Sequence, residues 1–264
     1  MVSPGQRRID RAQELAGEHA FAAEILSFFL PVARFQNVMH EQLGSMRPRS
    51  PSTTIDRELS RDELSELSSR FESFLTVVEM HGPPQLAEKS RALRARGKDF
   101  WAELLSGAWI ALSPSDAEGF LAQAFLQPYA QLLGLDASPR QAHHTYAVCP
   151  FCNRKPVVGV LRQMGDGAAR SLVCGFCLKE WEFRRIVCPG CGEENSQKLP
   201  VFTAKDFDYI RLDCCDSCKT YIKTVNLTLN GHAEPIVDEI ASAPLDLWAR
   251  DRGYAKLQKN LLGM

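Results

Sequence analysis

Eight of the nine cysteines in this chain of 264 residues form four Cys-x-x-Cys pairs, and all four lie between residues 149 and 218. The pairs are Cys149 and Cys152, Cys174 and Cys177, Cys188 and Cys191, and Cys215 and Cys218. One such turn presents two thiolates to a single cation, and two turns complete a tetrahedral shell of four sulfur ligands. The sequence therefore predicts two metal sites.

The spacing of the pairs favours one way of sharing the two ions. The gaps are 21, 10 and 23 residues, so a module of about 40 residues repeats. Sequential pairing gives each module its own site, with Cys149, Cys152, Cys174 and Cys177 on one ion and the other four on the second. An interleaved pairing is the alternative, but neither module could then close its own site. Four sulfur ligands suit Zn²⁺ and rubredoxin-type iron equally, so the spacing leaves the metal open.

The turn around each metal needs a residue that tolerates a left-handed backbone after its second cysteine. Asn153 and Gly192 meet this requirement, whereas Leu178 and Lys219 predict two turns that are more strained or differently built.

Three further residues are weaker candidates as metal ligands. Cys214 is predicted to be a free thiol that is buried or partly exposed, with a ligand exchange with Cys215 or a redox role as alternatives. His143 and His144 precede the first pair, but four cysteines per ion leave them no required role.

The elements that must position these cysteines change character near residue 145. Residues 1–140 contain no cysteine and have apolar residues at helical spacing, which predicts a bundle with one helix through Phe21, Phe28 and Phe35 as core residues. Further helices are expected near residues 64–78, 85–105 and 116–133.

From residue 145 the apolar pattern changes to short β-rich runs around the cysteine pairs. The expected strands are residues 157–162, 171–173, 180–187, 207–212 and 220–227. We therefore predict an α+β fold: a helical domain (1–140), two tandem rubredoxin-like or zinc-ribbon modules (145–187 and 188–230) and a helical tail (234–264). In the tail, Val237, Ile240, Leu245 and Trp248 are the expected buried face.

Charge and composition bear on several classes of function. Residues 146–225 carry 12 basic and 9 acidic side chains, and two four-thiolate sites with divalent ions would bring this region to about −1, which argues against a nucleic-acid-binding zinc ribbon. The first 20 residues lack the apolar stretch of a secretory signal, and no segment predicts a membrane span. Paired cysteines at metal spacing are typical of the reducing cytoplasm. No nucleophile–base pair or phosphate-binding loop is apparent, which favours a non-enzyme.

The chain resembles the bacterial formate dehydrogenase accessory proteins of the FdhE type. The resemblance extends over nearly the whole chain, through Phe21-Ala-Ala-Glu-Ile-Leu, Phe125-Leu-Gln-Pro-Tyr-Ala, Cys149-Pro-Phe-Cys152, Lys155-Pro-Val-Val, Glu180-Trp181, Arg184-Arg185-Ile, Asp213 to Lys223, and Val237-Asp238-Glu239-Ile240-Ala241-Ser242. It implies a cytoplasmic maturation factor that binds the formate dehydrogenase catalytic subunit. It also implies two rubredoxin-like sites on the eight paired cysteines, with iron favoured over zinc.

Two expectations follow for partners and for rival functions. Phe151 and Phe176, next to the cysteine turns, are candidate contacts for the catalytic subunit, and inward packing of both rings is the alternative. The main rival function is rubredoxin-like electron transfer or sulfur handling through Cys214, because iron with four sulfur ligands changes oxidation state. The sequence gives no indication of the oligomeric state.

Overall fold

The structure of the protein is a computed structural model, which describes residues 2–45, 55, 58–114, 116–135, 137 and 147–263. The chain divides into two compact units, one built from Met1–Ile9 and Ser27–Ser138 and the other from Asp10–Leu26 and Pro139–Met264. The second unit therefore includes a helical segment from the start of the chain. The candidate ligands His143 and His144 lie outside the described residues.

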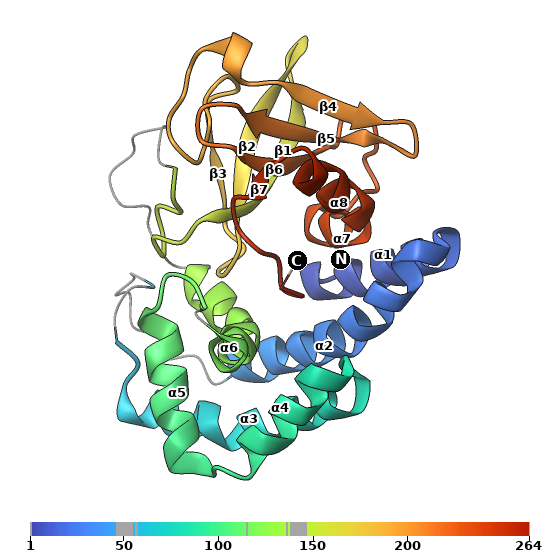
Figure 1. The fold of residues 1–264 in the computed structure, drawn as a ribbon. Helices are drawn as coiled ribbons and strands as arrows, with labels where there is room; N and C mark the ends of the chain where they lie inside the picture. The colour runs from blue at the N-terminus through green and yellow to red at the C-terminus, as the bar shows by residue number, and fades with distance from the viewer. Residues whose placement is uncertain are drawn as a thin grey trace. The chain divides into compact units, whose positions relative to one another are not determined.

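The described N-terminal region is helical, as predicted, but contains more helices than expected (Figure 1). The helices are α1 (Pro4–Glu18), α2 (Ala20–Ser45), α3 (Arg61–His81), α4 (Pro84–Arg94), α5 (Lys98–Ile110) and α6 (Ala117–Gly134). The single helix expected over residues 85–105 is broken into α4 and α5 at Gly97, which has a φ of 80°. A side chain is disfavoured in that conformation, so glycine permits the break.

The buried face of α2 differs from the predicted aromatic stripe. Phe21 is 45% exposed, and Phe28 and Phe35 are half-buried. The buried positions include Leu26 and Phe29 instead. Adjacent helical residues differ in direction by about 100° around the helix axis. Because the buried face is centred one residue along from the predicted one, the expected stripe lies at the edge of the buried face. The prediction for this stripe was therefore wrong in part.

The core of the first unit is aromatic. Phe71, Phe74 and Phe125 are almost fully buried, and the ring centroids of Phe71 and Phe125 lie 5.0 Å apart. Trp101 packs edge-on against Phe71 at 6.1 Å. Helix α3 covers the helix expected near residues 64–78, and its Leu67, Phe71, Phe74 and Val78 are buried. Within the described residues, no helix has both the length and the hydrophobicity needed to cross a membrane.

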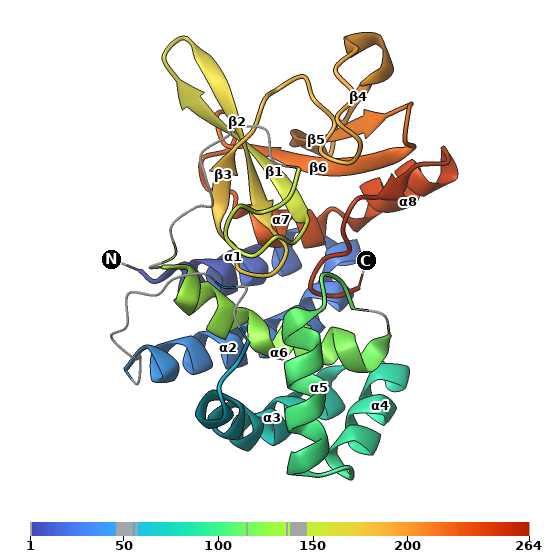
Figure 2. The same ribbon diagram turned by 90° about the vertical axis from the view of Figure 1, so that its left-hand side faces the viewer.

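The second unit contains a sheet whose strand order is β3-β2-β1-β6-β5-β4 (Figure 2). Strand β7 pairs with β6 outside this order. The strands are β1 (Pro156–Met164), β2 (Gly167–Cys174), β3 (Glu180–Glu182), β4 (Val201–Ala204), β5 (Phe207–Cys215), β6 (Thr220–Asn226) and β7 (Ala255–Lys256). The predicted strand over residues 180–187 ends at Glu182, and β4 and β7 were not anticipated.

The two predicted ribbon modules share this sheet. Strands β1 to β3 form one antiparallel set and β4 to β6 form another, and β1 pairs in parallel with β6 to connect them. At the junction Gly159 lies opposite Thr224, and a Cβ on Gly159 would lie 2.3 Å from Thr224 Oγ1. Glycine therefore allows the close approach of the two strands.

The predicted helical tail consists of α7 (Pro235–Ala241) and α8 (Ala243–Asp251). Val237, Ile240 and Leu245 are buried as expected, whereas Trp248 is half-buried and packs on Phe202 with ring centroids 4.8 Å apart. Helix α7 is buried along its whole length. Its polar residues must therefore have partners in the interior.

Buried ion pairs supply those partners. Arg11, on α1, donates to Asp238 at 2.7 Å, and Tyr209 donates to the same carboxylate at 2.7 Å. Lys223 Nζ lies 3.0 Å from Glu239, and Lys256 Nζ also binds Glu239. Burial alone would raise the pKa of Glu239, but the two lysines lower it to about 2. Glu239 is therefore held as a carboxylate inside the unit.

Candidate metal centres

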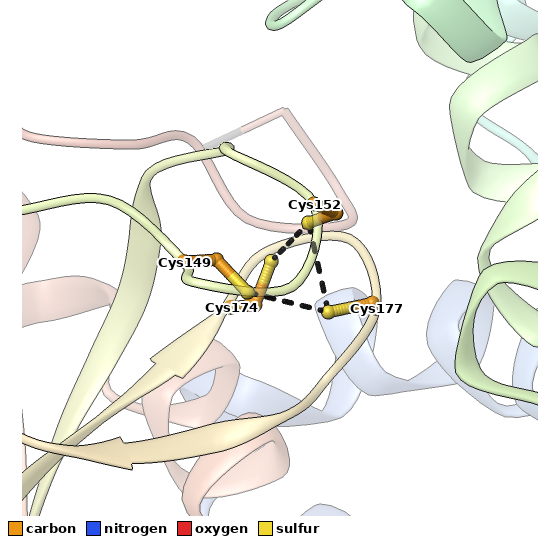
Figure 3. Close-up of side chains that lie close together, drawn as sticks. All are labelled: Cys149, Cys152, Cys174 and Cys177. Carbon is orange, nitrogen blue, oxygen red and sulfur yellow. Dashed lines mark hydrogen bonds between the residues drawn. The ribbon is translucent and has the colours of Figure 1, made fainter. Parts of the chain in front are cut away.

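The first group of sulfur atoms combines the first two cysteine pairs. Cys149 and Cys152 lie on the turn before β1, Cys174 ends β2, and Cys177 lies on the turn that follows (Figure 3). The Sγ atoms are separated by 3.5 Å between Cys149 and Cys177, 3.3 Å between Cys152 and Cys174, and 3.6 Å between Cys152 and Cys177. All four lie within 4.8 Å of one another.

The second group combines the last two pairs in the same way. Cys188 and Cys191 lie on a turn between the strand sets, Cys215 ends β5, and Cys218 lies on the turn before β6. The Sγ atoms of Cys188 and Cys218 are 3.6 Å apart, and those of Cys191 and Cys215 are 3.7 Å apart. The cysteines thus group as in the sequential alternative, and the interleaved pairing is wrong.

The sulfur positions fit a tetrahedral ion. A metal–sulfur bond of about 2.3 Å implies sulfur–sulfur edges of about 3.8 Å in a regular tetrahedron. The five separations range from 3.3 to 3.7 Å, which is close to this value. Each group therefore has the number, type and spacing of donors for one four-coordinate ion, and this donor set is common to zinc and iron.

All four cysteine turns have the same backbone conformation. The residue after the second cysteine has a φ of 61° at Asn153, 56° at Leu178, 78° at Gly192 and 56° at Lys219. Leu178 and Lys219 are therefore strained rather than differently turned, since a left-handed conformation costs a residue with a Cβ about 1–2 kcal/mol. Leu178 and Lys219 adopt this conformation despite its cost, so the interactions made by the thiols that these turns position must offset it.

Backbone N–H groups also point at the sulfurs. Phe176 N–H donates to Cys174 Sγ at 3.3 Å, and Gly190 N–H donates to Cys188 Sγ at 3.3 Å. Burial raises the pKa of Cys188 to about 12. Without a cation this thiol stays neutral at pH 7, whereas a bound metal stabilises the thiolate. The protonation state of Cys188 thus depends on whether an ion is bound.

The surroundings of the first group exclude water. All four of its cysteines are buried, and so is the neighbouring Arg154, whose guanidinium lies 3.7 Å from the centroid of the Phe176 ring. Burial lowers the pKa of Arg154, while the nearby cysteine sulfurs oppose this shift. Phe176 is only 3% exposed, which agrees with the inward-packing alternative for this ring, whereas Phe151 is half-buried.

The second group is open to solvent on one side. Cys191 is exposed and Cys218 half-buried, although Cys188 and Cys215 are buried. The Thr220 Oγ1 atom lies 3.0 Å from Cys218 Sγ. The two groups therefore share their local geometry and differ in access.

A buried arginine connects the first strand set to the second sulfur group. Arg170, on β2, donates to the backbone oxygen of Val187 at 3.2 Å, and its NH2 lies 2.9 Å from Asp213 Oδ2. Val187 precedes Cys188, and Asp213 lies two residues before Cys215. The burial of Arg170 and Arg154 was not predicted from the sequence. No local pattern shows that a basic residue is buried when its partners are distant in sequence.

Cys214 is buried and belongs to neither sulfur group. Neighbouring residues of a strand point to opposite faces, so Cys214 cannot share the direction of Cys215. Burial, with smaller contributions from Asp213 and Asp216, raises its pKa to about 12. Its thiol is therefore neutral near pH 7, as expected of a buried free cysteine.

Comparison with known proteins identifies the family. The model for the FdhE central domain matches residues 148–185, and the model for the FdhE C-terminal domain matches residues 186–262. A protein FdhE homolog of Stutzerimonas stutzeri is 31% identical in an alignment covering 97% of this chain and 88% of the relative. The chain belongs to the FdhE family. Each FdhE domain model contains one of the two sulfur groups, and the family comprises formate dehydrogenase accessory proteins.

Two more comparisons agree with this assignment. A protein FdhE homolog of Aquifex aeolicus is 29% identical, with 91% of this chain and 88% of the relative aligned. The crystal structure of the FdhE protein from Pseudomonas aeruginosa shares the fold, with a TM-score of 0.69, 22% identity, and coverage of 99% of this chain and 96% of that one. The resemblance inferred from the sequence is confirmed.

Proposed function

We propose that this FdhE protein is a cytoplasmic maturation factor that binds the catalytic subunit of formate dehydrogenase and catalyses no reaction itself. Membership of the accessory-protein family is the observation that carries this proposal. The two sulfur groups give it a physical basis, because metal-closed turns hold nearby loops in fixed positions without a large core. A preorganised surface loses little conformational entropy when a partner binds.

We further propose that the eight paired cysteines hold two metal ions. The sulfur–sulfur separations support this assignment. Iron is favoured over zinc because of the family resemblance. An ion at each centre would supply the cationic charge that keeps four thiolates together, while the chain supplies the turns and the N–H···S hydrogen bonds.

Rubredoxin-like electron transfer is the second candidate function, and the exposure of Cys191 in the second sulfur group favours it. Sulfur handling through Cys214 has less support, because the nucleophile in such chemistry is a thiolate and Cys214 is buried and neutral. Both rival functions require chemistry at a cysteine, whereas maturation by binding requires only that the sites keep their shape.

The test is an affinity capture from anaerobic cells that produce formate dehydrogenase. We expect the wild-type protein to retain the catalytic subunit and a strain lacking it to lose formate oxidation. Reloading purified protein with zinc separates the two functions: binding by shape survives in the redox-inert zinc form, whereas electron transfer does not. If no catalytic subunit is captured and formate oxidation persists without the protein, the maturation proposal is wrong.

A further inference from the structure

A cavity of about 390 Å³ lies where the two strand sets meet in the second unit. Arg170 of β2 forms one part of its wall, and residues of β4, β5, β6 and the segment 185–189 contribute to the rest, together with Ser196, Leu199 and Leu257. Cavities of this volume are typical of sites for small molecules.

The wall of this cavity is mainly apolar and extends from the surface into the core. Ile186 and Val201 line it and are 57% and 52% exposed, whereas Ile222, which also lines it, is only 2% exposed. Buried Cys214 also lines it. An occupant would therefore need an apolar body to contact these side chains.

The polar groups of the cavity are mostly hydrogen-bond donors. Arg170, Arg185 and Arg211 contribute guanidinium groups, and the carboxylate in the wall is that of Asp213. Asp213 already accepts from Thr224 at 2.8 Å and pairs with both Arg170 and Arg211. Arg170 is 4% exposed, and its Nε has no hydrogen-bond partner among the described residues. A buried donor without a partner is costly, so an occupant that brings acceptor atoms would be stabilised here.

The negative charge of the second sulfur group limits how much the net charge of the cavity wall contributes to the binding of an anion. Cys188 and Cys215 line the cavity, and a four-thiolate site with a divalent ion carries a charge of about −2. This charge offsets much of the excess from the three arginines. Recognition would therefore depend on directed, charge-assisted hydrogen bonds from guanidinium groups, for which a carboxylate is a well-matched acceptor.

We propose that this cavity is a binding site for a small organic anion that has an apolar body and one carboxylate or similarly acceptor-rich head group. The apolar body would lie against residues such as Ile186 and Ile222, and the head group would accept from the arginines. The proposal does not depend on binding of formate dehydrogenase, since every residue that it uses lines the cavity.

The direct test is a calorimetric titration of the metal-loaded full chain with octanoate and, separately, with the neutral octanamide. The two compounds share their apolar chain, so the difference isolates the head group. We expect octanoate to bind at least about tenfold more tightly, because one charge-assisted hydrogen bond is sufficient for that ratio.

Matched variants locate the site. Ile186→Trp should fill the cavity and weaken octanoate binding at least about tenfold, whereas Met164→Trp, at an exposed residue of β1 that is not part of the cavity wall, should change it by less than about twofold. Arg211→Gln should reduce the preference for octanoate over octanamide, and Arg162→Gln, at a residue that pairs with Glu180 on the surface, should leave it unchanged. Metal content is measured in each variant, so that loss of an ion is not mistaken for loss of the site.

Several results would overturn the proposal: no binding of octanoate to the wild-type chain, equal affinity for the two compounds, or binding that Ile186→Trp leaves intact. Capture of formate dehydrogenase by Ile186→Trp is measured in parallel. Normal capture by this variant together with lost octanoate binding separates this site from the proposed function, whereas a wild-type chain that binds octanoate but captures no catalytic subunit would locate the failure in the proposed function.

Discussion

The two sulfur groups have the same turns and opposite surroundings. Both place four Sγ atoms within 4.8 Å, and all four turns have a left-handed residue after the second cysteine. The first group is buried beside Arg154, whereas the second exposes Cys191 and borders a cavity. The comparison indicates that local sequence determines the geometry of the four sulfur atoms and tertiary packing determines the access of solvent to each group. We infer that the first site is structural and the second is the one that exchanges with solvent.

The largest effect is expected in two variants that each remove one cysteine ligand, one from the first site and one from the second. Cys149→Ser and Cys188→Ser should each lower the metal content from two ions to one. Metal binding supplies part of the folding free energy of such small modules, so each should lower the melting temperature of the second unit by more than about 10 °C. Elemental analysis and thermal melts provide the measurements.

The helices of the first unit should survive in both variants, because their core contains none of the eight cysteines. Circular dichroism at 222 nm monitors them. Loss of the helical signal together with the metal would show that the two units unfold as one, contrary to this expectation.

The next effect tests whether the second site depends on the first strand set. Arg170→Met removes one of the two arginines that pair with half-buried Asp213 and leaves Arg211 as its remaining partner. Loss of one partner of a buried pair costs up to about 3–5 kcal/mol. We expect the second site to lose affinity for its ion while the first keeps its own. Arg162→Met is the control, because Arg162 pairs with Glu180 at the surface. Retention of two tightly bound ions in Arg170→Met would disprove the dependence.

These effects also show what could be predicted from the sequence. The cysteine groups follow from local spacing, because two residues in one turn must lie close together. Most strand positions follow from the local pattern of β-rich runs around the cysteine pairs. The β1–β6 pairing was missed because it joins residues about 65 positions apart, Gly159 and Thr224, and no local pattern specifies such a pairing. Phe21 was misplaced for the same reason, since burial depends on which distant element covers a side chain.

A smaller effect is expected on the stability of the fold at low pH. The pKa of Glu239 is about 2 in the fold against an ordinary 4.5, so its ionised form stabilises the fold above pH 4.5, and this contribution is lost as the pH falls toward 2. The shift corresponds to about 3 kcal/mol. Glu239→Gln should be less stable than the wild type at pH 7, and the difference should narrow only below about pH 4.5. Urea denaturation at several pH values measures this difference. A difference that is independent of pH would show that the ionised form of Glu239 gives no net stabilisation.

The smallest effect is expected at Cys214. Cys214→Ser should leave two ions bound and the capture of formate dehydrogenase unchanged, because this thiol belongs to neither sulfur group. Burying a hydroxyl in place of a thiol should cost only about 1–3 kcal/mol. Loss of one ion would instead show that Cys214 serves as a ligand.

The most direct test of the difference between the two sites is the time course of metal release to a chelator under anaerobic conditions. We expect two phases in the wild type, with one ion leaving quickly and the other slowly. Cys149→Ser should retain the fast phase and Cys188→Ser the slow phase. A single phase for both ions, or a fast phase that persists in Cys188→Ser, would contradict the assignment of a closed first site and an open second one.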